Sequence, residues 1–224
     1  MDISIASFNS RGVEVTALHE NKPRLIKNLL SSSTISLLQE THSTNIENNK
    51  TLQSILPTSN LFFVPGSGSA GGLCSAFPAG SASFPHYQSE FFVSVLVKNL
   101  LPIDLSAYII NVYVNPRRTN EGADRLCEYI RSLPKSENII VMGDFNLDPK
   151  GRSSDGFSSL LGRLRDAGLR HIPTTQPSRF GGVGKNPSFI DHVFVRLASQ
   201  FTTTLNLRPV THSDHVALFL HISA

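Results

Sequence analysis

The order of short apolar runs along the chain predicts an α/β fold, with two packed mixed β-sheets flanked by helices. Three observations predict it. Runs rich in β-branched and aromatic residues recur from end to end, helix-like apolar stripes interrupt them, and no repeat or low-complexity linker divides the 224 residues. A chain of this length with 40% hydrophobic residues can bury one sizeable core. We therefore expect residues 1–224 to form a single domain.

The N-terminal part of the sequence predicts a strand, a helix and a second strand. Ile3–Phe8 alternates apolar and polar residues before reaching Phe8, which is typical of a strand entering a sheet. Leu25–Leu30 places its apolar residues on one helical face, and Pro23 is tolerated in a first turn. Ile35–Leu38 is a continuous apolar run and predicts a buried strand.

The remainder is richer in strand. Further strands are predicted at Leu61–Val64, Phe91–Val97, Ile103–Val114, Ile139–Met142, Ile190–Val195 and Val216–Ile222. The glycine-rich connection Gly66–Gly72 lacks the Lys-Ser/Thr pair of a phosphate-binding P-loop, so we expect a hairpin turn there. Apolar stripes predict helices over Leu126–Leu133 and Phe157–Leu164, the second stopped by Gly168. The long polar stretch Pro173–Ser188 is typical of a functional loop.

Composition excludes several classes of protein. No stretch approaches the roughly 18 consecutive apolar residues of a membrane span, and the N-terminus does not resemble a signal peptide. Two cysteines, Cys74 and Cys127, exclude a cysteine-based zinc site, argue against a disulfide scaffold and favour a reducing intracellular compartment. A net charge of +3 permits nucleic-acid binding without requiring it.

Polar residues gather at the edges of the apolar runs. They are Asn9, Glu40, Asp144, Asn146, Asp191, Asp214 and His215. If these strands share one core, their ends converge, and the carboxylate and amide oxygens suit a hard cation such as Mg²⁺. A neighbouring histidine can then act as base or charge stabiliser in an attack on phosphate. Taken singly, each residue is more often a turn residue or a helix N-cap.

Six short motifs occur in an order that resembles the endonuclease/exonuclease/phosphatase superfamily. They are Phe8-Asn9-Ser10-Arg11-Gly12, Gln39-Glu40-Thr41-His42, Asn111-Val112-Tyr113, Gly143-Asp144-Phe145-Asn146, Ser188-Phe189-Ile190-Asp191-His192 and Ser213-Asp214-His215. Within it, the chain looks most like the apurinic-type endonuclease domain of LINE-like non-LTR retrotransposons. The resemblance implies a four-layer, deoxyribonuclease I-like α/β sandwich with the active site at one end of the two sheets.

The resemblance also implies roles for individual residues at a Mg²⁺ site, where Mn²⁺ could substitute. Glu40 would be the main metal ligand, assisted by Asn9, and Asp214 would lie on the metal side of the site. The catalytic group would comprise Asp144, Asn146, His215, Asp191 and Tyr113, together with Asn9.

In that group, Asp144 would orient or deprotonate the attacking water, and Asn146 would hold Asp144 and the phosphate in place. His215 would contact the scissile phosphate while Asp191 orients its ring, and Tyr113 would donate a hydrogen bond to a phosphate oxygen. The resemblance does not say whether Asp144 or His215 removes the proton.

Cations on the expected rim of the site are candidates for DNA contacts, although each one alone is as often an ordinary solvated charge. They are Arg11, Arg117, Arg118, Arg179 and Lys185. Arg11 stands where abasic-site repair enzymes carry an aspartate, and the chain has no tryptophan to build a lesion pocket. Both departures favour an enzyme acting on undamaged DNA.

The resemblance therefore implies an endonuclease that nicks double-stranded DNA, leaving 3′-hydroxyl and 5′-phosphate ends that prime target-primed reverse transcription. A reverse transcriptase domain would follow in the same polyprotein, the isolated domain would be monomeric, and it would act in the nucleus. Three alternatives are an abasic-site repair endonuclease, a phosphatase or phosphodiesterase of the same fold, and a catalytically silent binding module.

Overall fold

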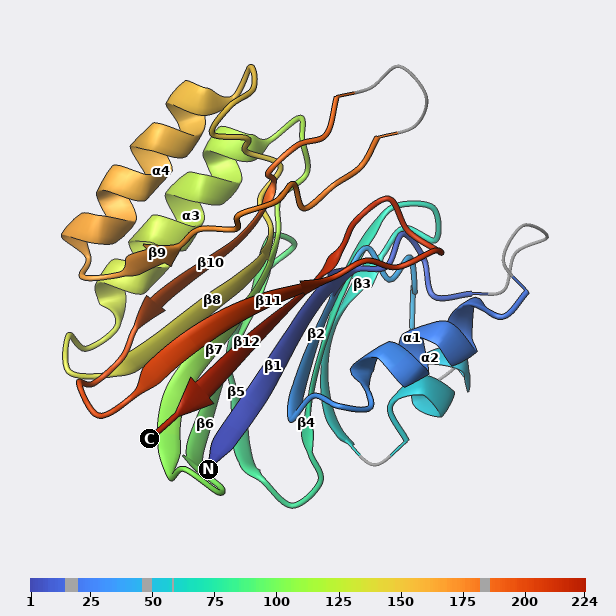
Figure 1. Cartoon of the computed structure of the whole chain (residues 1–224), viewed down its shortest axis with the longest axis horizontal. Helices are drawn as coiled ribbons and strands as arrows, with labels where there is room; N and C mark the ends of the chain where they lie inside the picture. The colour runs from blue at the N-terminus through green and yellow to red at the C-terminus, as the bar shows by residue number, and fades with distance from the viewer. Residues whose placement is uncertain (15–19, 46–49, 58, 182–185) are drawn as a thin grey trace.

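The computed structural model describes residues 1–14, 20–45, 50–57, 59–181 and 186–224. Two six-stranded sheets pack face to face, and helices cover their outer faces (Figure 1). The helices are α1 (Lys22–Leu30), α2 (Lys50–Ile55), α3 (Thr119–Ser132) and α4 (Ser154–Asp166). None of the helices in the described ranges is long and apolar enough to cross a membrane.

The first sheet has the strand order β11-β12-β1-β2-β4-β3, in which β1 runs parallel to β2 and antiparallel to β12. Its strands are β1 (Asp2–Asn9), β2 (Ile35–Gln39), β3 (Ser59–Gly66), β4 (Gly71–Pro78), β11 (Thr202–Arg208) and β12 (Ala217–Ser223). One parallel pair among antiparallel neighbours makes this a mixed sheet.

The second sheet has the order β5-β6-β7-β8-β10-β9, with β7 and β8 parallel. Its strands are β5 (Ala82–Gln88), β6 (Phe92–Leu100), β7 (Leu105–Tyr113), β8 (Asn138–Asp144), β9 (Arg170–Ile172) and β10 (Asp191–Arg196). The expected deoxyribonuclease I-like α/β sandwich of two mixed sheets flanked by helices is confirmed.

Three apolar clusters hold the four layers together. The central one lies between the sheets and includes Ile5, Val95 and Met142. The second joins α3 and α4 to the outer face of the second sheet, and the third joins α1 and α2 to the first. Because most strands are covered on both faces, they read in the sequence as nearly continuous apolar runs.

The predicted strands and helices are confirmed with small shifts in their ends. The helix predicted over Leu126–Leu133 begins earlier, at Thr119, and Gly168 follows α4 with the positive φ of a C-terminal stop. The strand predicted from Ile103 begins only at Leu105, because residues 101–104 form a turn. Five elements were missed, namely α2, β4, β5, β9 and β11. The strand β5 is mostly exposed and contains a proline at its bulge, so its sequence carries no core-facing pattern.

The register brings the polar ends of four strands to one end of the sandwich. Asn9 pairs with Gln39 at the ends of β1 and β2, and Asp144 pairs with Asp191 where β8 ends and β10 begins. The two chain termini lie at the opposite end of the sheets (Figure 1). Parallel and antiparallel pairing together therefore produce the convergence that the sequence suggested.

A glycine is required just before Asp144. Gly143 has φ +150°, and a Cβ atom added there would lie 2.0 Å from the carbonyl oxygen of Val112 on the neighbouring strand. Only a residue without a side chain allows the two strands to approach this closely at the point where Asp144 begins.

Candidate active site

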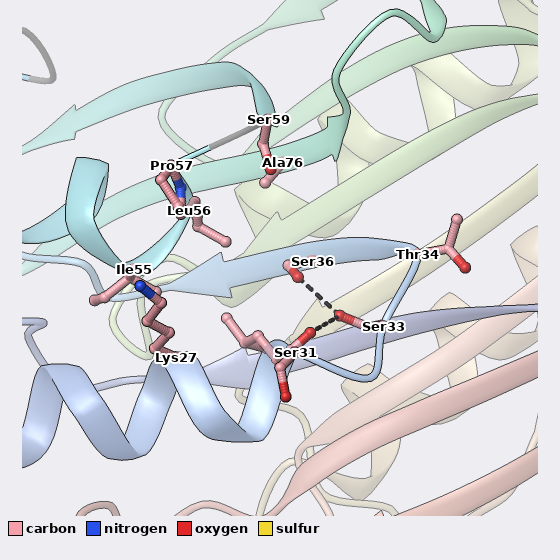
Figure 2. A pocket seen from close by; sticks show the side chains of 11 residues that line it. Lys27, Ser31, Ser33, Thr34, Ser36, Ile55, Leu56, Pro57, Ser59 and Ala76 are labelled. Atoms are coloured by element: carbon pink, nitrogen blue, oxygen red, sulfur yellow. Dashed lines mark hydrogen bonds between the residues drawn. The ribbon is translucent and has the colours of Figure 1, made fainter.

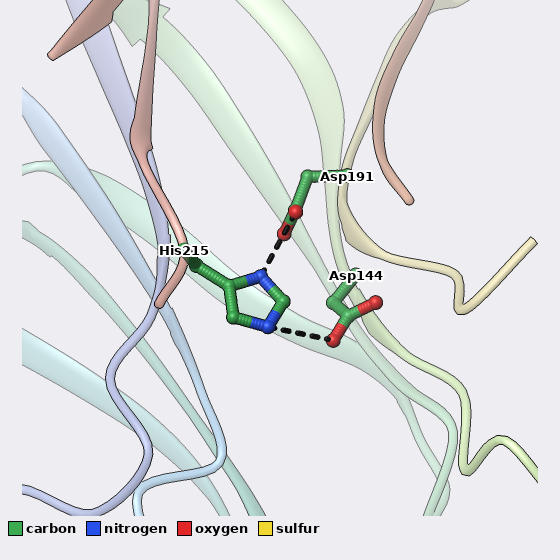
Figure 3. Close-up of side chains that lie close together, drawn as sticks. All are labelled: Asp144, Asp191 and His215. Atoms are coloured by element: carbon green, nitrogen blue, oxygen red, sulfur yellow. Dashed lines mark hydrogen bonds and ion pairs between the residues drawn. The ribbon is translucent and has the colours of Figure 1, made fainter. Parts of the chain in front are cut away.

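A histidine flanked by two aspartates is buried at this end of the sandwich. His215 Nδ1 lies 2.9 Å from Asp191 Oδ2, and its Nε2 lies 3.9 Å from Asp144 Oδ2 (Figure 3). All three side chains are at least 96% buried. Asp191 and Asp144 are paired across β10 and β8, whereas His215 comes from the segment just before β12 in the other sheet. The group therefore spans both sheets.

The three charges perturb one another strongly. Burial by itself would lower the pKa of His215, but the negative charges of Asp191, Asp144 and Asp214 outweigh it and raise that pKa to about 9. Burial and the charge of Asp191 raise the pKa of Asp144 to about 7. His215 is thus protonated at neutral pH, and Asp144 titrates near neutrality, where a general base works best.

Asp144 is oriented from both sides. Asn9 Nδ2 donates a 2.8 Å hydrogen bond to Asp144 Oδ2, and the main-chain N–H of Asn146 donates one of 2.9 Å to Oδ1. The Asn146 side chain donates instead to the carbonyl of Val114, at 2.9 Å. Asn146 thus holds Asp144 through its backbone and not through its side chain.

Glu40 and Tyr113 form a second group. Tyr113 Oη donates a short 2.5 Å hydrogen bond to Glu40 Oε1, and His42 Nε2 lies 3.6 Å from Oε2. Burial opposes ionisation of Glu40, but the hydrogen bonds from His42 and Tyr113 and the charge of Arg11 hold its pKa below the usual range. Glu40 is therefore an ionised oxygen donor. His42, which sequence reasoning left without a role, is part of its surroundings.

Asp214 lies between two arginines. Its Oδ2 is 2.9 Å from Arg11 and 2.8 Å from Arg179 Nε, and its Oδ1 is 4.0 Å from His215 Nε2. Burial alone would raise the pKa of Asp214, but the two guanidinium groups hold it below the usual range. The structure thus brings Arg11 and Arg179 to the site, on the carboxylate expected at its metal side.

The other candidate DNA-binding residues are less close together. Arg118 is paired with Glu90 and Glu121 and lies over the ring of Phe91. Arg117 is exposed in the turn that follows β7. Lys185 lies outside the described residues.

Strained backbone also concentrates here. Among the described residues, six that are not glycine have a positive φ, and four of these are Arg11, Glu40, His42 and Asn146. Left-handed backbone costs an ordinary residue about 1–2 kcal/mol. It persists where surrounding contacts over-determine it, which is common at functional sites.

A model of the endonuclease/exonuclease/phosphatase family matches residues 6–215, which include every motif that carries the resemblance. The chain belongs to this family. No curated protein matches it by sequence.

Solved structures show the same fold at low sequence identity. The endonuclease domain of TRAS1, a telomere-specific non-LTR retrotransposon, has a TM-score of 0.72 at 14% identity, over 99% of this chain and 98% of that one. An AP endonuclease from Leishmania major has a TM-score of 0.77 at 14% identity, over 100% and 88%. A mannosyl-6-phosphatase from Bacteroides thetaiotaomicron has a TM-score of 0.66 at 16% identity, over 99% and 100%. The fold alone therefore does not separate nuclease from phosphatase.

The donor set of this family member suits a divalent cation. One ligand atom from each of Asp144, Asp191 and His215 lies within 4.8 Å of the others, and Glu40 adds an ionised carboxylate. Oxygen-rich sites of this kind favour Mg²⁺ or Mn²⁺ over softer metals. Within that cluster, Asp191 Oδ2 and His215 Nδ1 are already joined by a hydrogen bond.

Several supporting residues gave no signal in the sequence. Ser178 Oγ accepts hydrogen bonds from the N–H groups of Ile190 and Asp191, at 3.1 and 2.9 Å, and so fixes the start of β10. Ser213 Oγ donates to the Asn9 carbonyl at 2.9 Å and thereby ties the His215 segment to β1. Only the motif position of Ser213 beside His215 could have pointed to such a role.

Two hollows of the described surface lie near the strands that carry the Glu40 group. One of about 220 Å³ lies at the far end of β2 from Glu40, and its Ser33 hydroxyl is bonded to Ser36 and to the Leu30 carbonyl (Figure 2). The Ser33 and Ser36 hydroxyls are therefore used within the fold. Another, of about 360 Å³, is lined by Tyr113 and the β3–β4 turn, and it adjoins the Glu40 group.

Proposed function

We propose that this protein is a divalent-metal-dependent endonuclease that nicks undamaged double-stranded DNA. The observation that carries the proposal is the buried Asp191–His215–Asp144 group with Asn9, which has two arginines at its edge. Phosphodiester hydrolysis depends mainly on positioning and charge neutralisation. The fixed imidazolium of His215, the carboxylate of Asp144 with its pKa of about 7 and the adjacent guanidinium groups can supply both.

In the proposed reaction, Asp144 accepts the proton of the attacking water, which forms a bond to phosphorus as the bond to the 3′-oxygen breaks. His215 donates a hydrogen bond from Nε2 to a non-bridging phosphate oxygen, while Asp191 holds the ring by Nδ1. A divalent cation held by Glu40 would neutralise charge that develops on the phosphate and on the leaving oxygen. The leaving 3′-oxygen takes a proton from solvent, so that the products are 3′-hydroxyl and 5′-phosphate ends.

We further propose that the chain is the endonuclease module of a non-LTR retrotransposon that acts on nuclear DNA, where a reverse transcriptase domain would extend the new 3′-hydroxyl. Similarity to the TRAS1 endonuclease domain over nearly the whole of both chains supports this role. Arg11 supports it too, because it stands where the repair enzymes carry an aspartate. The similarity to an AP endonuclease makes abasic-site cleavage the second candidate.

The test is nicking of supercoiled, undamaged plasmid in Mg²⁺, with an EDTA control. We expect nicks in the wild type and at least about a hundredfold less in His215→Ala. The matched control is His221→Ala, on the same terminal segment but facing Asp2 at 3.9 Å at the opposite end of β12, and it should nick normally. A strong preference for an abasic duplex would instead identify the protein as an abasic-site repair endonuclease. Cleavage of phosphomonoesters alone would refute the proposal that it is a nuclease.

A further inference from the structure

The contacts of Asp214 are unusual for a metal ligand. Its Oδ2 accepts a 2.8 Å hydrogen bond from Arg179 Nε and forms an ion pair with Arg11 Nη1 at 2.9 Å, and these two arginines lie far apart in the sequence. Both groups are guanidinium cations, which pair with carboxylate and phosphate oxygens. Oδ2 thus meets two positive charges at contact distance, while Oδ1 is buried, makes no hydrogen bond with any described residue and lies 4.0 Å from His215 Nε2.

The backbone of Arg11 is held as firmly as its side chain. Its φ of +48° is left-handed, its N–H donates to Asn9 Oδ1 at 3.1 Å, and its carbonyl accepts a 2.9 Å hydrogen bond from Lys22 Nζ. Lys22 is only 3% exposed, which is rare for a lysine. Asn9 also donates to Asp144, so a single amide positions both the arginine and the proposed base.

Arg179 is fixed by main-chain pairing. Its N–H donates to the Ser188 carbonyl at 3.0 Å and its carbonyl accepts from the Ser188 N–H at 2.9 Å, while an isolated bridge joins it to His215. The next N–H, that of Phe180, donates to the carbonyl of Asp214 itself, at 2.7 Å. The guanidinium is therefore built onto the same backbone that presents the histidine.

The exposures of the three side chains show which groups can meet a ligand. Arg11 is 51% and Arg179 32% exposed, whereas Asp214 is only 16% exposed. Each guanidinium has five N–H donors and uses only part of them here, so donors remain for an incoming anion. A divalent cation at Asp214 would instead meet the charges of both arginines.

We propose that Asp214 is a positioning residue, which holds Arg11 and Arg179 as a fixed pair of phosphate-binding cations and does not ligate the metal. This replaces the metal-side role that the sequence suggested for Asp214. The identity of the anion, a DNA phosphodiester, rests on the proposed function, but the statement about the metal does not.

The metal part is tested by calorimetric titration of Mn²⁺ into the wild type, Asp214→Asn and Glu40→Gln, in the absence of DNA. We expect Asp214→Asn to bind Mn²⁺ within about threefold of the wild type, because the metal is held elsewhere. Glu40→Gln should weaken binding by at least about tenfold. Loss of about tenfold or more in Asp214→Asn would overturn the proposal.

The phosphate part is tested by duplex binding in EDTA, where no cleavage occurs. Arg11→Gln and Arg179→Gln should each lower the slope of log K against log salt by about 1, as expected for one lost phosphate contact. The matched control, Lys135→Gln, removes an exposed charge from the turn before β8, at the far end of that strand from Asp144, and should leave the slope unchanged. Both arginine positions are partly exposed, so these variants should fold. Unchanged slopes in both would overturn the proposal.

The kinetics of DNA cleavage distinguish a positioning role of Asp214 from a role as a metal ligand. Asp214→Asn should lower kcat by about tenfold or more, because the arginines lose their anchor, with the Mg²⁺ concentration for half-maximal rate unchanged. A shift in that concentration with an unchanged kcat would overturn the proposal. If the wild type nicks no DNA, the proposed function fails, and the Mn²⁺ titrations still decide the role of Asp214.

Discussion

The charge of Asp191 is the main support for the imidazolium of His215, and Asp191→Asn removes that charge with little change in shape. Asp191 lies 2.9 Å from the ring, while the other two carboxylates lie at 3.9 and 4.0 Å. The pKa of His215, about 9, exceeds the ordinary 6.5 despite a burial that would lower it. That difference corresponds to about 3 kcal/mol in favour of the charged ring.

If Asp191 supplies most of that difference, the pKa of His215 falls to about 7 in Asp191→Asn. At pH 8 the protonated fraction of the ring then drops from about 90% to about 10%, a ninefold change. At pH 6 the ring is protonated in both proteins. We therefore expect nicking to fall by about tenfold more at pH 8 than at pH 6, relative to the wild type.

Two measurements check this. An NMR titration of the His215 ring in the metal-free protein reports its pKa directly, and single-turnover nicking between pH 6 and 9 reports the defect. Asp2→Asn, beside the half-exposed His221, is the matched control and should alter neither. An unchanged His215 titration, or a nicking defect equal at every pH, would refute the reasoning.

Two further predictions concern stability. Gly143→Ala should lower the free energy of unfolding by about 3 kcal/mol or more in a denaturant titration, because its Cβ would clash with Val112. Gly162→Ala, in α4 with open space around it, should instead raise it by up to about 1 kcal/mol, and a similar loss in both would contradict this account. Burial, with a smaller effect of His192, lowers the pKa of His171 from 6.5 to about 4, so the unfolded chain binds more protons between these pH values. The free energy of unfolding should therefore fall as pH drops from 6.5 to 4, by at most about 3 kcal/mol. In His171→Phe that fall should be smaller. Equal slopes of unfolding free energy against pH in the two proteins would refute this prediction.

The sequence predicted the central strands well because they are covered on both faces. Ile139–Met142 and Ile190–Val195 are uninterrupted apolar runs, and they form β8 and β10 with shifts of a residue or two. The strand β11 was missed because its burial alternates with exposure and its apolar positions are few, and no long-range partner is visible in a single sequence. A core strand can be predicted from its own apolar run, whereas an edge strand is stabilised by pairing with neighbours that lie far away in the sequence.

The candidate site could be predicted as a set of residues but not as a set of contacts. The motifs placed Asp144, Asp191 and His215 correctly at strand ends, and the register brings them together. The buried Lys22 and the pairing of Arg11 with Asp214 depend on loop conformations with left-handed backbone. Such conformations are set by tertiary contacts, so residue type alone does not predict them.

Polar residues directly behind the site account for how its two halves stay aligned. The site spans two sheets, and an apolar interface between sheets has little directional preference. Gln39 Nε2 donates to Asn111 Oδ1 at 2.7 Å across that interface, and Asn111 Nδ2 donates back to the Leu38 carbonyl at 3.1 Å. Both side chains are fully buried. Because buried hydrogen bonds are costly to break, they fix the offset of β2 against β7.

The same two strands are joined again one step nearer the surface, by the hydrogen bond from Tyr113 to Glu40. Gln39 directly precedes Glu40, and Asn111 lies two residues before Tyr113, so each motif supplies one residue to the buried bridge and one to the site. The spacing explains why these short motifs are informative together. The buried pair sets the register between the sheets, and that register places the carboxylate of Glu40 against the phenol of Tyr113.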